Sequence, residues 1–135
     1  MVKRVSLQSV ASLHLRLDDS PRTCSPRRMI HVIATIEVAP GTRDAFLAEF
    51  RKLTPKVHAE NGCIEYGAAI DVNSGISIQD APRVDTVVVI EKWSDVSALK
   101  AHLAAPHMNE YREAVKDMVR GVRLQVLQPA TEQKL

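Results

Sequence analysis

The chain has little of what marks several classes of protein. It has only two cysteines, Cys24 and Cys63, and their separation is not that of a metal-binding motif. So few cysteines argue against a disulfide framework and favour a reducing cytoplasm. No apolar run approaches the roughly 20 residues that a transmembrane helix requires. Lys and Arg are scattered, whereas a nucleic-acid surface requires a concentrated basic face. A membrane-spanning helix is therefore excluded, and nucleic-acid binding is unsupported.

What the chain does have is the composition of an ordinary globular protein. Its 135 residues suit one domain with a real core. Apolar residues make up 45% and charged residues 25%, and the net charge is only +2.

The first 28 residues differ from the rest. Residues 2–17 alternate loosely without a clean period, and residues 18–28 are typical of a linker. A secretory signal would need a compact apolar core, which is absent, and Asp18 and Asp19 argue against a transit peptide. We expect residues 1–28 to be a dispensable extension, with Met29 as the natural first residue. The domain then spans residues 29–130, followed by a tail at 131–135.

Apolar alternation and β-branched residues indicate the strands. The turn residues Asn73, Ser74 and Gly75 separate two of them, and Pro82 lies in an irregular connection. The predicted strands are residues 30–38, 63–72, 84–93 and 122–127.

Helical spacing fills the intervals between strands. Residues 43–59 form one predicted helix, with Thr42 as its N-cap, a kink or weak point at Pro55, and a stop at Asn61-Gly62. Ser94 is the expected N-cap of a short helix over residues 95–104, which ends before Pro106. A further helical piece carries its apolar residues at intervals of three and four: Met108, Tyr111, Val115 and Met118.

The resulting order is β-α-β-β-α-β, an α+β ferredoxin-like fold with the helices on one face of an antiparallel four-stranded sheet. In the first strand Val32, Ala34 and Ile36 share one face, and Ile33 and Thr35 share the other. Both faces are thus mostly apolar, which does not suit a sheet with one face in water. We expect a homodimer in which two sheets pack face to face.

The most informative stretch is Glu91-Lys92-Trp93-Ser94-Asp95, followed by His102. It contains the single tryptophan of the chain and marks the change from strand to helix. Alternation places Glu91 and Trp93 on one face of the strand. Because His102 lies two turns into the next helix, we expect the indole and the imidazole to border one cavity.

The chain resembles the antibiotic biosynthesis monooxygenase (ABM) family over residues 29–130. The matching segments, in order, are Pro40-Gly41, Glu60-Asn61-Gly62-Cys63-Ile64-Glu65-Tyr66, Glu91-Lys92-Trp93-Ser94-Asp95, Ala98-Leu99-Lys100-Ala101-His102-Leu103 and Pro106-His107-Met108. The resemblance implies a dimeric α+β barrel with a pocket between sheet and helices in each subunit. It also implies cytoplasmic oxygenation of a small aromatic substrate, a quinol or polycyclic phenol, by dioxygen and without any cofactor.

Oxygenation without a cofactor requires an electron-rich substrate anion, so the protein must assist loss of a proton in a water-poor pocket. His102 is the candidate base, since imidazole titrates near neutral pH. Trp93 and Tyr66 are the other candidate catalytic residues. The N–H of Trp93 could donate to a ligand or an oxygen intermediate, and the Tyr66 hydroxyl could reach the pocket mouth. The candidate substrate-binding residues are Phe50, Glu91, His107, Met108, Tyr111 and Met118.

Each candidate also has a purely structural interpretation. Trp93 and Tyr66 could anchor the core, Glu91 could form a salt bridge with an Arg or His, and His107 could lie at the surface. A metal site is not expected, because Pro106 breaks the helix between His102 and His107 and removes the spacing of a zinc helix.

Other functions stay open at this point. Haem degradation in related proteins uses a first-strand asparagine with a tryptophan and a histidine, but the corresponding residue here is Ala34. Isomerisation or lactone chemistry on a small oxo-substrate suits the same fold and a histidine. A non-enzymatic dimeric ligand-binding or stress-associated protein is the remaining alternative.

Overall fold

The computed structural model describes residues 29–132 of the chain. These residues form four strands and three helices, and the last two helices follow each other without a strand between them. In chain order they are β1 (Ile30–Val38), α2 (Arg43–His58), β2 (Cys63–Ala69), β3 (Thr86–Trp93), α3 (Val96–Leu103), α4 (Pro106–Val115) and β4 (Val119–Leu127).

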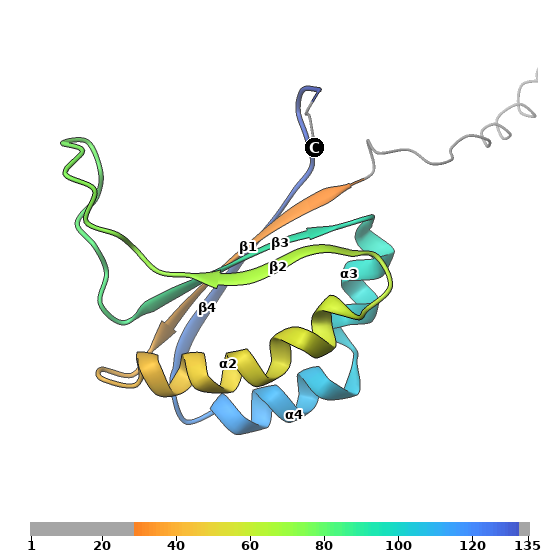
Figure 1. The fold of residues 1–135 in the computed structure, drawn as a ribbon, viewed down its shortest axis with the longest axis horizontal. Coiled ribbons are helices and arrows are strands. Elements are labelled where there is room, and N and C mark those ends of the chain that lie inside the picture. Colours follow the sequence, from red (N-terminus) through yellow and green to blue (C-terminus); the bar gives the residue numbers. More distant parts are fainter. Residues whose placement is uncertain (1–28, 133–135) are drawn as a thin grey trace, which may run out of the picture.

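The strands form one antiparallel sheet in the order β2-β3-β1-β4, and all three helices lie on one side of it (Figure 1). Helices α2 and α4 run side by side, and α3 lies at the end of the sheet where β3 finishes. This is the ferredoxin-like α+β fold that the sequence predicted, with the second helical region divided at Pro106.

The two faces of the sheet differ in burial. The face toward the helices holds Val32, Val87 and Trp93, which are fully buried, and each such side chain contributes about 2 kcal/mol through the hydrophobic effect. On the opposite face Ile33 pairs with Ile90, of which 37% is exposed. The predicted division of β1 and β3 residues between two faces is confirmed, and the face away from the helices is only partly covered.

The strand boundaries differ from the predictions in three places. The second strand ends at Ala69 and the third begins at Thr86, so residues 70–85 form a long connection that extends beyond the sheet (Figure 1). We call this connection the β2–β3 arm. The alternating pattern continues through residue 72, but Ala69 is the last residue that β3 pairs with. The fourth strand begins earlier than predicted, because Gly121 pairs with Glu37 of β1 and, after a shift in register, Val119 pairs with Val38.

The predicted helix ends need smaller corrections. Asp95, not Ser94, is the N-cap of α3, since its carboxylate accepts a hydrogen bond from the amide of Ala98 at 2.8 Å. Thr42 does occupy the N-cap position of α2, but its hydroxyl donates to the carbonyl of Ala39 instead of capping the helix. Helix α2 continues past Pro55 to His58.

Two earlier expectations lie wholly or partly outside the described residues. The prediction of a dispensable extension concerns residues 1–28, and most of the predicted C-terminal tail, residues 133–135, is likewise not described. Within residues 29–132, no helix has both the length and the apolar character needed to cross a membrane.

Candidate active site

The last residues of β3 turn a polar pair toward the helices. Val89, Glu91 and Trp93 alternate onto the covered face and are all buried. The indole Nε1 of Trp93 donates a hydrogen bond to Glu91 Oε1 at 2.8 Å. A charged side chain in this position needs such a donor, because burial penalises an unpaired carboxylate.

Helix α3 places His102 against this pair. Its cap at Asp95 fixes the start of the helix directly after β3. Two turns later the imidazole of His102, only 1% exposed, lies 4.7 Å from the Trp93 ring between centroids, with an interplanar angle of 35°. The predicted proximity of indole and imidazole is therefore present, as a direct contact between two buried rings.

The turn between α2 and β2 is locked onto α3. Gly62 has a φ of +87°, and a Cβ added there would lie 2.7 Å from both the Cβ of Ala98 and the Oγ of Ser94. The carbonyl of Gly62 accepts a hydrogen bond from the amide of Ser94 at 2.8 Å. Only glycine combines this backbone conformation with so close an approach. The turn thereby holds Glu60 beside α3.

Glu60 joins two histidines through one oxygen. Its Oε2 lies 3.0 Å from Nδ1 of His102 and 2.6 Å from Nε2 of His107. In a continuous helix two residues five apart would point about 140° away from each other. The break at Pro106 starts a new helix instead, and both imidazoles reach the same carboxylate. Side-chain exposure rises outward along this row, from 1% for His102 to 13% for Glu60 and 22% for His107.

Tyr66 extends the group toward α2. Its ring meets that of His102 edge-on at 5.4 Å and stacks on Phe50 at 5.3 Å. A continuous row of rings thus leads from Phe50 on α2 to Trp93 on β3. We call the six residues at its inner end the histidine cluster: Glu60, Tyr66, Glu91, Trp93, His102 and His107.

Burial dominates the electrostatics of the cluster. It raises the pKa of Glu91 above its ordinary value, an effect that the Trp93 hydrogen bond and nearby His102 partly offset. It raises the pKa of the Tyr66 hydroxyl strongly, and the charge of Glu91 adds to the rise. The pKa of the neighbouring Cys63 thiol is also raised, first by burial and then by Glu60 and Glu91. Burial in the site therefore favours the neutral forms of Glu91, Tyr66 and Cys63.

Three buried polar atoms of the cluster have no hydrogen-bond partner in the described part of the chain. Within residues 29–132, neither Nε2 of His102 nor the hydroxyl of Tyr66 is hydrogen-bonded to another residue, and the same holds for Glu91 Oε2. Buried polar groups are nearly always paired with protein, water or a ligand. Three such atoms on neighbouring side chains make this the best candidate for chemistry in the described part of the chain.

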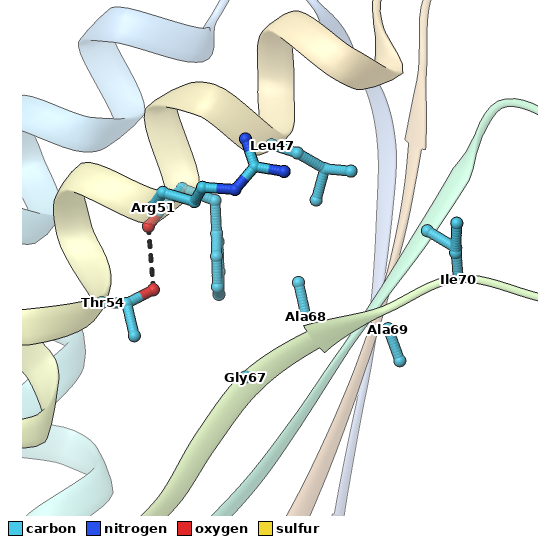
Figure 2. A pocket seen from close by; sticks show the side chains of 8 residues that line it. Leu47, Arg51, Thr54, Gly67, Ala68, Ala69 and Ile70 are labelled. Atoms are coloured by element: carbon cyan, nitrogen blue, oxygen red, sulfur yellow. Dashed lines mark hydrogen bonds between the residues drawn. The ribbon is translucent and has the colours of Figure 1, made fainter.

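The pocket beside the cluster lies between α2 and β2. It has a volume of about 290 Å³ and is lined by Leu47, Phe50, Arg51, Thr54 and residues 67–70. Figure 2 shows Ala68 directed from β2 toward α2, whereas Ala69 points to the other side of the strand. Neither His102 nor Trp93 lines this pocket. Phe50 is the shared element, because it forms pocket wall and also stacks on Tyr66.

The remaining predicted substrate-binding residues separate into two groups. Tyr111 packs edge-on against Phe46 at 6.0 Å and Phe50 at 6.2 Å, and Met108 is buried in the core nearby. Met118 lies past the end of α4, where its carbonyl accepts a hydrogen bond from the amide of Ala39. Since Ala39 follows the last residue of β1 while Trp93 pairs with the first, Met118 lies at the opposite end of the sheet from the cluster.

Glu60 is the functional candidate that reasoning from single positions missed. The sequence does contain a usable signal, because Glu60 immediately precedes the helix stop at Asn61-Gly62. The backbone of such a turn fixes where the carboxylate lies. Its partners, however, come from α3 and α4, far along the chain, and a local pattern does not reveal them. The pocket residues Leu47 and Arg51 were missed for a similar reason, since a helix pattern does not tell which strand the helix faces.

The pairing of two histidines with one carboxylate does not amount to a metal centre. The separations of 2.6 and 3.0 Å are hydrogen-bond distances. In the described range 29–132, no three His, Cys, Asp or Glu side chains are arranged to hold a metal ion.

Comparison with known proteins gives consistent matches. Residues 29–114 match a family model described as antibiotic biosynthesis monooxygenase. The chain is 43% identical over 104 residues to the Escherichia coli K12 protein named probable quinol monooxygenase YgiN, covering 75% of this chain and 98% of that one.

Solved structures agree on the fold. The crystal structure of PA3566 from Pseudomonas aeruginosa superposes with a TM-score of 0.66 at 25% identity, covering 80% of this chain and all of that chain (100%). That of Rv0793 from Mycobacterium tuberculosis gives a TM-score of 0.64 at 26% identity, covering 78% of this chain and 99% of that one.

Proposed function

Since this chain belongs to the antibiotic biosynthesis monooxygenase family, we propose that it oxygenates a quinol or phenolic substrate with dioxygen and needs no cofactor. Family membership supports a monooxygenase-type role. The finer assignment draws on the relative named as a quinol monooxygenase and on the chemistry of the histidine cluster. The observation that carries it is the set of buried polar atoms around His102 that have no hydrogen-bond partner within residues 29–132.

The proposed reaction requires one base and an electron-rich substrate. The hydroxyl proton of the quinol or phenol passes to Nε2 of His102, leaving an aromatic oxyanion. The anion gives one electron to dioxygen, and the resulting radical pair combines to form a carbon–oxygen bond. One oxygen atom stays in the product and the other leaves as water, so the substrate supplies all four electrons that dioxygen consumes.

The cluster residues have distinct proposed roles in this scheme. His102 takes the proton, and the Tyr66 hydroxyl donates a hydrogen bond to the substrate oxygen as negative charge develops there. Because burial raises the pKa of Tyr66, this hydroxyl stays protonated and remains a donor throughout the neutral pH range. Trp93 holds the carboxylate of Glu91, and together they close the inner wall against water.

We place the aromatic ring of the substrate in the pocket between α2 and β2. Its volume of about 290 Å³ is at the lower end of the range of ligand pockets, about 300–1,000 Å³, which suits a small fused-ring molecule. Phe50 forms one wall, and Tyr66 lies directly behind it. Access to His102 therefore requires the stacked rings of Phe50 and Tyr66 to separate as the substrate enters.

The experiment is oxygen consumption by purified, metal-stripped protein against a panel of quinols, naphthols and anthrones. We expect protein-dependent uptake that resists chelators and a fall in kcat of about 100-fold or more in His102→Gln, the loss typical of a general base. Uptake that is unchanged in His102→Gln would move the base elsewhere. No uptake with any member of the panel would overturn the proposed activity.

We also propose that the active form is a homodimer in which the open faces of two sheets pack together. Ile33, Val88 and Ile90 lie at neighbouring positions on that face, and a second sheet would remove them from water. The salt bridge between Lys92 and Glu65, 3.3 Å long, lies beside them on the same face.

The dimer has a direct test in the mass of the protein in solution. We expect twice the chain mass at micromolar concentration and a shift to monomer in Ile90→Lys, which places a charge in the proposed interface. A monomeric mass for the unaltered protein would contradict the dimer.

A cytoplasmic location is proposed as well, in keeping with the unpaired thiol of Cys63.

A further inference from the structure

A single carboxylate oxygen receives both histidines of the cluster. Glu60 Oε2 lies 3.0 Å from His102 Nδ1 and 2.6 Å from His107 Nε2. These groups come from three separate places, the α2–β2 turn, α3 and the first turn of α4. The backbone fixes each one: Gly62 locks the turn onto Ala98, Asp95 caps α3, and Pro106 begins α4.

The contact decides which nitrogen of His102 carries the proton. An ionised carboxylate only accepts hydrogen bonds, so the nitrogen facing it must be N–H. With Nδ1 protonated, a neutral imidazole presents Nε2 as a lone pair. That nitrogen is the one left without a partner within residues 29–132, in a ring that is 1% exposed. The base required by the proposed reaction is therefore available only in this tautomer.

We propose that Glu60 is a positioning residue that holds His102 in its base-competent tautomer and stabilises the imidazolium formed when the substrate proton arrives. This inference rests on the proposed function for its catalytic meaning, although the tautomer itself is a property of the resting protein. The carboxylate acts through His102 and does not touch the substrate.

His107 supports the same carboxylate from the solvent side. Its Nε2 donates to the oxygen that His102 uses, and its side chain is 22% exposed. A second donor limits rotation of the Glu60 carboxylate and offsets the loss of hydration around it. Because His107 acts on Glu60 and not on the base, its removal affects catalysis less than removal of Glu60.

The substrate and His102 supply all the protons that the proposed reaction transfers. The substrate O–H bond breaks as an N–H bond forms at Nε2 of His102, and Glu60 balances the new positive charge. His102 returns this proton to the outer oxygen of the peroxide intermediate, and its Nε2 then takes the proton of the oxygenated carbon. As that C–H bond and the oxygen–oxygen bond break, a C=O bond forms and the departing oxygen receives the second proton and leaves as water. Glu60 remains a carboxylate throughout and needs no exchange with solvent.

Other titratable groups face the same ring and belong in any account of pH dependence. Glu91 lies on β3 and interacts with His102 through its charge. Tyr66 on β2 contacts the imidazole edge-on, and Cys63 lies near both Glu60 and Glu91. Of these groups only Glu60 is hydrogen-bonded to the His102 ring within the described residues.

Glu60→Gln isolates the charge from the packing. The amide has the same size but can turn its NH2 group toward Nδ1 and so stabilise the wrong tautomer. We expect kcat to fall about 100-fold with little change in KM. In Glu60→Asp, which restores the charge, part of the activity should return.

Glu110→Gln is the matched control. It makes the same chemical change on an exposed carboxylate of α4, whose ion-pair partner is Lys56 at 3.8 Å and which, within residues 29–132, has no hydrogen bond to a cluster residue. Its kcat, KM and pH profile should equal those of the unaltered protein. His107→Gln should give an intermediate loss, of about tenfold.

Nitrogen-15 NMR of the His102 ring supplies a test that needs neither activity nor a variant. We expect the neutral ring of the unaltered protein to carry its proton on Nδ1. A proton on Nε2 would overturn the inference, and so would full activity of Glu60→Gln beside an inactive His102→Gln. If no substrate of the panel is oxidised but the proton is on Nδ1 and moves in Glu60→Gln, the proposed function fails while the positioning role of Glu60 stands.

Discussion

The histidine cluster and the β2–β3 arm use similar bonds in opposite surroundings. In the arm, Asp71 and Arg83 form a two-pronged ion pair at 2.8 and 2.9 Å, comparable with the 3.0 Å between Glu60 and His102. The arm's pair is held by an Arg83 side chain that is 50% exposed, and Ile78 in the arm is 90% exposed. The His102 ring is 1% exposed and packs among α3, β2 and β3. The same kind of contact therefore adds little stability in the arm. In the cluster it determines which nitrogen of His102 carries the proton.

The difference lies in how many elements hold each group. The arm is held mainly by its own residues, such as Gln79, whose side chain bonds to the carbonyl of Val72. In the cluster, Glu60, Tyr66, Trp93, His102 and His107 all contact residues of other elements, so a change at one position disturbs several. Substitutions that are matched between the two regions should therefore differ in size.

The largest expected contrast is between two glycines with left-handed backbones. Gly62→Ala should lower the free energy of unfolding by about 3 kcal/mol, because it adds strain and a clash with Ala98. Gly75→Ala in the arm has the same backbone strain but open space around its Cβ, so about 1 kcal/mol is expected. Urea unfolding of both variants measures the difference. Equal losses would mean that the turn is not locked against α3.

Glu91→Gln should stabilise the cluster at neutral pH. Burial raises the pKa of Glu91 in the folded state, so folded-state stability declines as pH rises through that pKa and the carboxylate ionises. An amide keeps an acceptor for Trp93 and removes the buried charge, with an expected gain of about 1 kcal/mol. The gain should vanish near pH 4, where the acid is protonated in both states. Denaturant melts of variant and unaltered protein at pH 4 and pH 8 make the comparison, and a gain independent of pH would contradict it.

Removing the charge of Arg83 in the arm should change the pKa of Asp71 but hardly change the stability of the folded protein. The hydrogen bonds from Arg83 lower the pKa of Asp71 to about 2. The pair therefore stabilises the folded state at pH values above the ordinary pKa of Asp, and this stabilisation is lost as the pH falls toward 2. Arg83→Gln should return the pKa of Asp71 toward about 4, with little change in melting temperature. Carbon-13 NMR titration of the Asp71 carboxyl group measures the shift. A large drop in melting temperature would show that the arm is coupled to the core.

The smallest expected effect is that of removing residues 1–28. A protein that begins at Met29 should keep its melting temperature and its oxygen uptake, because the elements that build the cluster all lie between residues 30 and 127. Differential scanning calorimetry of both forms tests this. A drop of several degrees would show that the extension takes part in the fold.

Much of the fold could be predicted from local pattern. β1 was predicted with its observed limits, and the helix break before Pro106 was anticipated. The predicted strand limits were wrong where hydrogen bonding between strands, and not the alternation of apolar residues, decides where a strand ends. The alternating residues after Ala69 have no partner strand, and Val119 belongs to β4 because it pairs with β1. The helix begins one residue later than predicted, so Asp95 is the N-cap and accepts from the amide of Ala98, while the amide of Ser94 donates to the carbonyl of Gly62 in the neighbouring turn.

The sequence by itself determined the strands, the helices, the two-faced sheet and the meeting of Trp93 with His102, since all of these depend on periods of two or 3.6 residues within one segment or between adjoining segments. Only the tertiary structure decided that Glu60 would bind residues 42 and 47 positions away, and that the pocket would open beside Phe50. Such contacts depend on how whole elements pack, and no local period encodes that. The glycine at position 62 and the proline at position 106 connect the two levels, because each uses a local backbone property to permit one long-range approach.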